Sequence, residues 1–401
     1  MVVTGLGIVS CIGNSAETVV DALRHQRCGI RFIPEYAELG LRSQLAGVPD
    51  LTHEASVARK FRRYMGDASL YAYHAMRQAV ADAALSPAMV AHPRTGVVTG
   101  SGIGSGFHHV QAIQILRERG ADRIPPYTVP QAMASTTSAC LSTAYGIQGV
   151  SYSMTAACAT SAHCVGHAAD LIRMGKQDVV FAGGGEEVCW TTTAPFDAMG
   201  ALSTHFNDAP MTASRPYDAD RDGFVIAGGA GILVLESLAH ALARGARIYA
   251  EMIGYGATSD GLDMVNPNPE GCARAMRLAL AEADRRVDYV NTHATSTPAG
   301  DLVEVQAMRE VFGPTMPDYS STKGLTGHSI GAAGAQELIY SLLMMHNGFI
   351  GGSPLAGRIA PEITGHAPIF APIQREFTTI MSNSLGFGGS NASLILTRDI
   401  G

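Results

Sequence analysis

Apolar residues along the chain form short unbroken runs that alternate with segments of helical periodicity. The runs predict buried strands at 2–9, 95–100, 178–183, 224–236, 247–256, 287–293, 379–384 and 392–397. Helical spacing of apolar positions is clearest at 67–84, 160–174, 271–283 and 332–346. Strands that alternate with helices in this way predict an α/β fold with buried central sheets.

Motifs recur in the same order along the chain. GVVTGSG at 96–102 parallels YVNTHAT at 289–295, and FVIAGGAGILVLE at 224–236 parallels LGFGGSNASLILT at 385–397. In each half, a turn followed by a helix of small residues lies between the first motif and the second. We interpret this order as an internal repeat.

The repeat divides the chain into two predicted halves, 1–243 and 244–401. No Pro-rich, Ser-rich or single-sign charge run separates them, so they are expected to pack as one body. With 401 residues, the chain is long enough to bury a large core. Its 45 glycines exceed the usual share of about 7% and cluster in loops, where the backbone turns tightly or approaches a ligand.

Charged residues make up 16% of the chain, below the roughly 25% typical of soluble domains. We therefore expect part of the surface to be buried in a homo-oligomer. The net charge of −7 does not favour nucleic acid. No apolar run is long enough to span a membrane, and the apolar N-terminus lacks the basic segment of a signal peptide, so no membrane insertion is expected.

The seven cysteines show no CxxC pair and no even framework, which indicates reduced thiols in a cytoplasm. Cys158 stands apart because it lies between the strand-like VSYSMTA and a helix that begins TSAHC. At a helix N-terminus, unpaired N–H groups and the dipole favour a thiolate. The alternative is a buried cysteine that only fills space.

Two loops far downstream supply basic partners for this thiol. His293 ends the apolar run VDYVNTH, and Lys323 and His328 lie in STKGLTGHS, just before another small-residue helix. A single loop histidine is usually an ordinary surface or core residue. Two that each follow a strand, in a chain with a thiol at a helix start, favour nucleophilic catalysis.

The combined motifs resemble the beta-ketoacyl-[acyl carrier protein] synthases, the condensing enzymes of fatty-acid synthesis. The resemblance covers essentially the whole chain, and EEVCW and FDAMGALSTHFND are most similar to bacterial synthase I. Relatives usually carry one or two basic residues before the first strand, so the chain is expected to have been started slightly late. The motifs are VVTGLGIVSCIG, AACATSAHC, SRPYDADRDGFVIAGGAG, HATSTPAGD, STKGLTGHSIGAAG and NSLGFGGSNASL.

The resemblance implies a duplicated thiolase-like fold of five layers, αβαβα, a homodimer, and substrates carried on the phosphopantetheine arm of acyl carrier protein. It implies no cofactor and no metal. The reaction would be decarboxylative condensation of a malonyl group with an acyl chain held on Cys158. His293 and His328 would stabilise the malonyl enolate, and backbone N–H groups of Cys158 and Phe387 would form the oxyanion hole.

Supporting roles are also carried over from the family. Lys323 would organise the electrostatics of the site with Glu304 as its carboxylate partner. Thr295 and Thr297 would bind the pantetheine arm, although threonines in a turn also satisfy local backbone groups.

The acyl pocket is where the chain departs from its relatives. Met133 matches a position that lines the pocket across the dimer. Leu385 stands where relatives commonly have Phe, so chain-length preference is left open. Ala294 stands where relatives often have Gly, and we expect its methyl group to be tolerated.

An acidic carrier needs a local basic surface on this acidic chain. ARKFRRYMGD supplies Lys60, Arg62 and Arg63 in one run. We predict that these residues dock the carrier; the alternative is a solvated helix start.

Other motifs favour different sites only weakly. GSGIGSG follows a strand but does not fit GxGxxG, which disfavours a nicotinamide cofactor. Zinc on Cys158, His163, Cys164 and His167 is disfavoured because Cys164 points away from the two histidines on the helix. Asn291, Ser382 and Asn383 resemble a loop site for a small cation in relatives and are interpreted as structural at most.

Some alternatives concern the reaction class. A specialised polyketide or polyene condensing enzyme and a catalytically silent partner subunit both stay open. Cys158 weighs against the silent subunit, which typically loses this cysteine. A thiolase is disfavoured by GFGGSN, where thiolases carry a second cysteine, and synthase III relatives use Asn in place of one histidine.

Overall fold

The computed structural model describes residues 1–363 and 365–400. In chain order, the strands are β1 (Val2–Val9), β2 (Ile30–Phe32), β3 (Leu45–Gly47), β4 (Thr95–Gly100), β5 (Ser151–Tyr152), β6 (Val179–Glu186), β7 (Gly229–Glu236), β8 (Ala250–Ser259), β9 (Tyr289–Asn291), β10 (Asp318–Ser320), β11 (Phe349–Ile350), β12 (Ile373–Gln374), β13 (Thr379–Gly386) and β14 (Ser390–Thr397).

Helices lie between these strands along the chain. In chain order they are α1 (Ala16–Arg24), α2 (Pro34–Glu38), α3 (Arg59–Arg62), α4 (Asp67–Asp82), α5 (Pro87–Val90), α6 (Gly106–Arg119), α7 (Thr128–Ala132), α8 (Thr136–Tyr145), α9 (Thr160–Arg173), α10 (Trp190–Met199), α11 (Leu238–Ala243), α12 (Pro269–Glu282), α13 (Gly300–Phe312), α14 (Lys323–Thr326) and α15 (Ala333–His346).

The strand order is the same on both sides of the molecule. The main sheet runs β10-β9-β13-β14-β8-β1-β7-β6-β4-β5. Read outward from the β1–β8 contact, each side has two antiparallel pairings followed by two parallel ones. Among the described strands, β1 and β8 connect the two sides of the sheet, where Val2 pairs with Glu251 and Val3 with Ala250.

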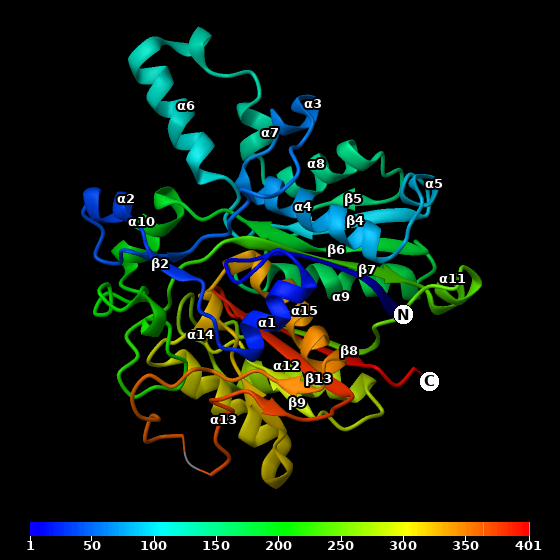
Figure 1. The fold of residues 1–401 in the computed structure, drawn as a ribbon, viewed down its shortest axis with the longest axis vertical. Helices are drawn as coiled ribbons and strands as arrows, with labels where there is room; N and C mark the ends of the chain where they lie inside the picture. The colour runs from blue at the N-terminus through cyan, green and yellow to red at the C-terminus, as the bar shows by residue number, and fades with distance from the viewer. Residues whose placement is uncertain (364, 401) are drawn as a thin grey trace.

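Helices complete the layers (Figure 1). On one outer face, α4 packs against β1, β7 and β6, and on the opposite outer face α12 packs against β8 and β14. Between the two sets of strands lie α9 and α15, which contact each other. The predicted five-layered αβαβα fold of the duplicated thiolase-like type is thus confirmed.

The central layer is the most apolar part of the molecule. In α15, Ala333 through Met345 are all buried, and the apolar face of α9 joins the same core cluster. Burial of apolar side chains stabilises a fold by about 25 cal/mol per Å², so this layer contributes to stability along its whole length. A helix that is apolar all round must be covered on every side, as α15 is.

The predicted strand whose start differs most from the structure is 224–236. The run 224–236 begins its sheet pairing only at Gly229, the start of β7. Phe224 and Ile226 instead make isolated bridges to Leu202 and His328. The first residues of this run therefore leave the sheet and support the loop that carries His328.

One helix projects from the layered body. Helix α6 extends away from the body in Figure 1 and has no buried residue. Within the described residues, no helix is both long and apolar enough to cross a membrane.

Candidate active site

Cys158 lies at a sharp turn that leads into α9. The preceding Ala157 has a φ of 47°, a left-handed conformation uncommon for a residue with a side chain. Thr160 fixes this turn, because its hydroxyl donates to the Ala157 carbonyl at 2.7 Å and accepts from the Ala156 N–H at 2.8 Å. Cys158 lies just ahead of α9, as the sequence predicted, and it is buried.

His328 is held through its backbone by the segment that leaves the sheet. Its N–H donates to the Val225 carbonyl at 2.8 Å, and its carbonyl accepts from the Ala227 N–H at 2.9 Å. The imidazole stands edge-on to the Phe224 ring, with centroids 5.4 Å apart. An extended segment outside the main sheet thus fixes the position of His328.

His293 follows β9 by two residues. A buried carboxylate, that of Glu304 on α13, accepts from the backbone N–H groups of His293 at 2.9 Å and Ala294 at 2.8 Å. The Asn383 side chain donates to the same carboxylate at 3.1 Å. Glu304 therefore fixes the turn that aims the imidazole.

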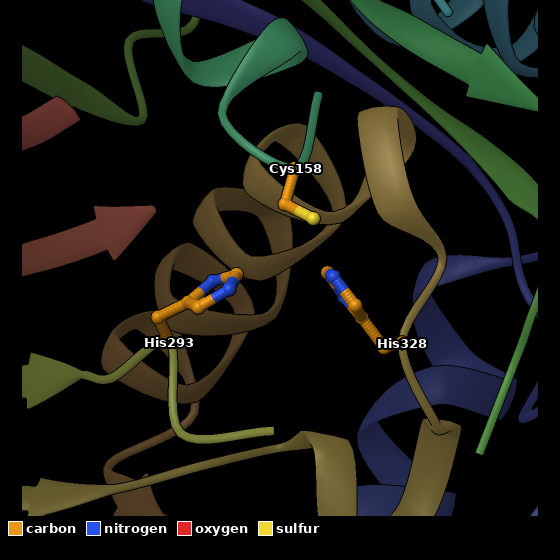
Figure 2. A group of neighbouring side chains, drawn as sticks. All are labelled: Cys158, His293 and His328. Carbon is orange, nitrogen blue, oxygen red and sulfur yellow. The ribbon is translucent and has the colours of Figure 1, made fainter. Parts of the chain in front are cut away.

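The structure brings the three predicted side chains together. The Sγ of Cys158 and a ring nitrogen of each histidine all lie within 4.8 Å of one another. The imidazoles are 5.1 Å apart between centroids and nearly perpendicular, at 87°. Figure 2 shows the two rings on either side of the space that the cysteine sulfur faces.

The predicted partner of Lys323 is wrong. The ammonium group forms its ion pair with Glu337, not with Glu304. The physical reason is that the Glu304 oxygens are already occupied by N–H donors from the His293 turn and Asn383. Glu337 lies on α15, where a charged residue in an otherwise apolar helix needs a buried partner of opposite charge.

Burial controls the protonation states in the site. It raises the pKa of the Cys158 thiol to about 12, although the charge of Lys323 and the N–H of Phe387 oppose this shift. Burial, reinforced by Lys323, holds the pKa of both His293 and His328 well below the usual value. The resting site thus contains a thiol and two neutral imidazoles, and the helix start alone does not produce the thiolate that the sequence suggested.

Phe387 lies in the turn between β13 and β14. Its backbone N–H lies near enough to the Cys158 sulfur to oppose the rise in the pKa of the thiol. The turn can approach so closely because residue 386 is glycine, where a Cβ would come within 2.7 Å of the Ala156 carbonyl oxygen. Two backbone N–H groups, those of Cys158 and Phe387, therefore bear on the sulfur, an arrangement suited to an oxyanion hole.

A cavity of about 330 Å³ leads to the three side chains. Ala294, Thr295, Thr297 and Leu385 line it, and so does Phe387. Ala294 is 2% exposed in this wall, and tolerance of its methyl group stays a prediction.

The remaining predicted residues lie away from the cavity. Met133 caps α7 and is absent from the cavity wall of this single chain. Lys60, Arg62 and Arg63 lie at exposed α3, where Arg62 donates to the Met65 carbonyl at 2.7 Å. Arg63 stacks over a nearby tyrosine ring, and Lys60 over Phe61.

Sequence reasoning missed two buried acids of the site. Glu337 is the partner of Lys323, and Glu186 accepts from the N–H groups of Gly102 at 2.6 Å and Gly331 at 2.8 Å. Burial raises the pKa of each to about 7. A usable signal was present: a glutamate inside an apolar helix, and another at the end of the apolar strand VVFAGGGE.

The rejected zinc set does not converge. His167 Nε2 bonds the Tyr152 hydroxyl at 2.7 Å, and both nitrogens of His163 bond other hydroxyls. Cys158, His293 and His328 are themselves of types that ligate zinc. The positive charge of Lys323 beside both imidazoles opposes a dication there, and a metal-free site stays a prediction.

A duplicated five-layered fold, with a cysteine ahead of one central helix and two histidines facing it, defines a condensing enzyme of the thiolase-like class. Comparison with known proteins gives the family. Residues 1–241 match "Beta-ketoacyl synthase, N-terminal domain" and residues 249–354 match "Beta-ketoacyl synthase, C-terminal domain". The chain belongs to the beta-ketoacyl synthase family.

Individual relatives agree over their full length. The chain is 54% identical over 399 residues to 3-oxoacyl-[acyl-carrier-protein] synthase 1 of Escherichia coli K12, covering 99% of this chain and 98% of the relative. A beta-ketoacyl synthase structure from Burkholderia phymatum is 35% identical, with a TM-score of 0.93 over 100% of this chain and 99% of that one. The predicted family and its likeness to synthase I are confirmed.

A third relative comes from another pathway. It is the ketosynthase of a type II polyketide system, solved in complex with its acyl-carrier protein and bound to the hexaketide. It is 27% identical, with a TM-score of 0.89 over 99% of this chain and 98% of that one. The predicted enzyme class, an acyltransferase that condenses acyl groups, is confirmed by these relatives together.

Proposed function

We propose that this enzyme elongates fatty acids by condensing malonyl groups with acyl chains, both carried on acyl carrier protein. The observation that carries the proposal is a set of unbonded polar atoms. Within the described residues, His293 Nδ1 and both ring nitrogens of His328 are buried without a hydrogen-bond partner. Buried polar atoms are normally paired. Three without partners, beside a buried thiol and at the end of a cavity, fit a site completed by substrate.

Acyl transfer is the first step. One neutral imidazole accepts the Cys158 proton as the sulfur attacks the acyl thioester carbonyl. The carbon–sulfur bond to the carrier then breaks, and the carrier thiolate regains the proton. Because the thiol pKa is raised to about 12, a base within reach is needed for this step.

Decarboxylation follows at the other side of the cavity. As the malonyl carboxylate leaves as carbon dioxide, its electron pair forms an enolate whose oxygen becomes negative. N–H groups of His293 and His328 donate to that oxygen. Both imidazoles are neutral because burial and Lys323 lower their pKa, and a neutral imidazole carries one N–H to donate.

Condensation completes the cycle. The enolate carbon attacks the acyl carbon on Cys158, and the resulting oxyanion accepts from the N–H groups of Cys158 and Phe387. When this intermediate collapses, the Cys158 sulfur leaves as a thiolate and takes up one proton from solvent water, which restores the thiol. Thr295 and Thr297, whose hydroxyls lie 3.3 Å apart in the cavity wall, are placed to bind the pantetheine arm.

The test is a product assay. Purified enzyme is incubated with malonyl-carrier and with acyl-carriers of graded length and unsaturation, and the products are measured by mass spectrometry. We expect 3-oxoacyl-carriers two carbons longer than each accepted acyl chain. Decarboxylation without elongated product would instead identify a silent partner subunit, and repeated extension of one chain a polyketide enzyme. The 54% identity to synthase 1, against 27% to the polyketide enzyme, favours a single elongation.

The carrier is proposed to dock on exposed α3. Charge reversal of Lys60 and Arg63 to Glu is expected to raise KM for carrier-bound substrates severalfold and to spare small thioesters. Lys176→Glu, on the turn after α9, is the matched control because its side chain is also exposed. Unchanged KM in the α3 variant would contradict the docking proposal.

A homodimer is proposed from the surface around α6. Apolar side chains here are solvent-exposed in the single chain, and β5 has no partner on its outer edge among the described strands. Exposed apolar patches and open sheet edges commonly mark interfaces. Leu116→Glu should produce monomers in sedimentation velocity, whereas Leu242→Glu on α11 should not. The same interface would bring Met133 to the partner's cavity.

The two remaining proposals concern organisation and compartment. We propose that the halves divide at residue 243, between α11 and β8, where the chain passes from one set of strands to the other. We also propose a cytoplasmic enzyme with no cofactor of its own. All seven cysteines are free thiols, which fits a reducing compartment.

A further inference from the structure

His163 occupies an unusual place, on the helix of the nucleophile but outside the cavity wall. It lies on α9, five residues after Cys158, and is 9% exposed. Its Nε2 is 3.1 Å from the Ser390 hydroxyl, and its Nδ1 is 2.7 Å from the Tyr255 hydroxyl. One buried imidazole therefore ties α9 to two strands of the other half.

Ser390 is the first residue of β14 and closes the turn that carries Phe387. It pairs with Gly386 across the hairpin, so the two residues form the base of that turn. On its other side the turn rests against the Cys158 elbow, where a Cβ at residue 386 would come within 3.3 Å of the Cys158 nitrogen. The turn is thus held at two places: His163 of α9 bonds its base at Ser390, and the Cys158 turn just ahead of α9 packs against Gly386.

Tyr255, on β8, serves as the second anchor. Its ring lies so close to α9 that a Cβ on Gly166 would come within 2.4 Å of it. The ring stands edge-on to His163, with centroids 6.1 Å apart. Burial lowers the pKa of His163, so the ring is neutral, with one donor and one acceptor nitrogen. A hydroxyl can complement either nitrogen.

We propose that His163 is a positioning residue that sets the spacing between the Phe387 and Cys158 N–H groups through its bond to Ser390. The positions of both N–H donors of the proposed oxyanion hole then depend on one helix, α9. The inference rests on the proposed function, because it assigns His163 to steps that use this hole. Those steps are acyl transfer and condensation, whereas malonyl decarboxylation relies on His293 and His328.

Two conservative variants separate the two bonds of His163. The amide of His163→Gln can reach the position of Nε2 and keep the Ser390 bond, and the amide of His163→Asn can reach only that of Nδ1 and keep the Tyr255 bond. For His163→Asn we expect acyl transfer to Cys158 to slow by about tenfold to a hundredfold. Decarboxylation should change by less than about twofold, and His163→Gln should restore most of the acyl-transfer rate.

Matched controls use the same helix and the same turn. His167→Asn removes a histidine bond from α9 to Tyr152, away from the turn, and should leave acyl transfer unchanged. Ser390→Ala should reproduce His163→Asn, and combining the two should add no further loss, because both remove one bond. Equal losses in His163→Asn and His163→Gln, parallel losses of both reactions, or multiplying losses in the double variant would overturn the proposal.

A second measurement needs no carrier substrate. The Phe387 N–H stabilises the Cys158 thiolate, so a displaced turn should slow alkylation of Cys158 by iodoacetamide, read by mass spectrometry. Slower alkylation in His163→Asn, but not in His163→Gln or His167→Asn, supports the positioning role even where wild-type condensation is absent. Unchanged alkylation in His163→Asn contradicts it. Failure of condensation in the wild type would refute the proposed function alone.

Discussion

β4 and β9 occupy the same place in the strand order of the two halves, yet the turns that follow them carry different groups. After β4, the N–H groups of Gly102 and Ile103 bond the carboxylate of Glu186. After β9, the N–H groups of His293 and Ala294 bond the carboxylate of Glu304. In each half a buried glutamate fixes the turn, but only the second turn presents an imidazole.

The two central helices show the same relation. In the sequence, α9 begins shortly after Cys158, and α15 begins shortly after His328. Because these two side chains lie close together, both helices begin near the cavity. The duplicated frame thus provides equivalent sites, and the side chains at these sites have diverged. One half supplies the nucleophile and the other supplies the two neutral imidazoles. This comparison predicts that variants in the two halves change acyl transfer and decarboxylation to different extents.

The largest expected effect is that of Cys158→Ala. Acyl transfer and condensation should fall by ~10⁴-fold or more, because no other group in the cavity can hold the acyl chain. Malonyl decarboxylation should persist, since the imidazoles are intact. Intact-protein mass spectrometry measures acylation, and released carbon dioxide measures decarboxylation. Cys164→Ala, a buried thiol on the same helix, is the control. Acylation that survives in Cys158→Ala would break the division between the halves.

Replacing either imidazole should slow decarboxylation more than acyl transfer, because decarboxylation uses both rings as N–H donors and acyl transfer uses one ring as a base. His293→Ala and His328→Ala are each expected to slow decarboxylation by about 10²–10³-fold, as for the loss of one oxyanion donor. The ratio of decarboxylation to acyl transfer should fall in both variants. His205→Ala, which removes an exposed imidazole, should leave the ratio unchanged. A ratio that stays constant in all three variants would show that the histidines serve both steps equally.

A change at Lys323 should alter the pH dependence. Its charge lowers the pKa of both imidazoles, so Lys323→Gln should let these pKa values rise toward the usual value. A protonated imidazole cannot accept the Cys158 proton. The acid limb of acyl transfer should therefore move to higher pH, with up to about a tenfold loss near pH 5.5 and little change at neutral pH, because pKa values at or below the usual 6.5 leave the imidazoles mostly neutral there.

A pH–rate profile of single-turnover acylation checks this shift. Lys176→Gln, which removes an exposed ammonium group, is the control. A limb that stays in place, or moves to lower pH, would mean that Lys323 does not set the protonation of the histidines.

The sequence indicated the fold and the catalytic trio because both leave local signals. Apolar runs and helical periodicity marked the sheets and the central helices. His293 ends one of these runs, and Cys158 and His328 each lie just ahead of a predicted helix. β7 was expected to start at 224, but an apolar run looks the same whether it pairs in a sheet or, as Phe224 and Ile226 do, crosses the site.

Pairings between distant elements left no such signal. Glu304 and Glu337 are both acids on helices near the site, and only the folded arrangement shows that Glu337 reaches Lys323. The raised pKa of Cys158 follows from burial by residues throughout the chain, which a helix-start argument does not include. His163 resembled a zinc ligand in sequence, and its bond to Ser390 appears only when α9 meets β14.

The smallest expected effect concerns Leu385, which lines the cavity next to the Phe387 turn. It belongs to the imidazole half but borders the acyl chain held by the other half. Leu385→Phe fills part of the roughly 330 Å³ cavity, so long acyl chains should lose more than short ones, by about tenfold or less in relative kcat/KM. Competition between acyl-carriers of different length measures this preference, with Leu242→Phe on α11 as the control. A uniform loss at every length would show that Leu385 does not border the acyl chain. Selection of chain length would then depend on other residues of the cavity wall.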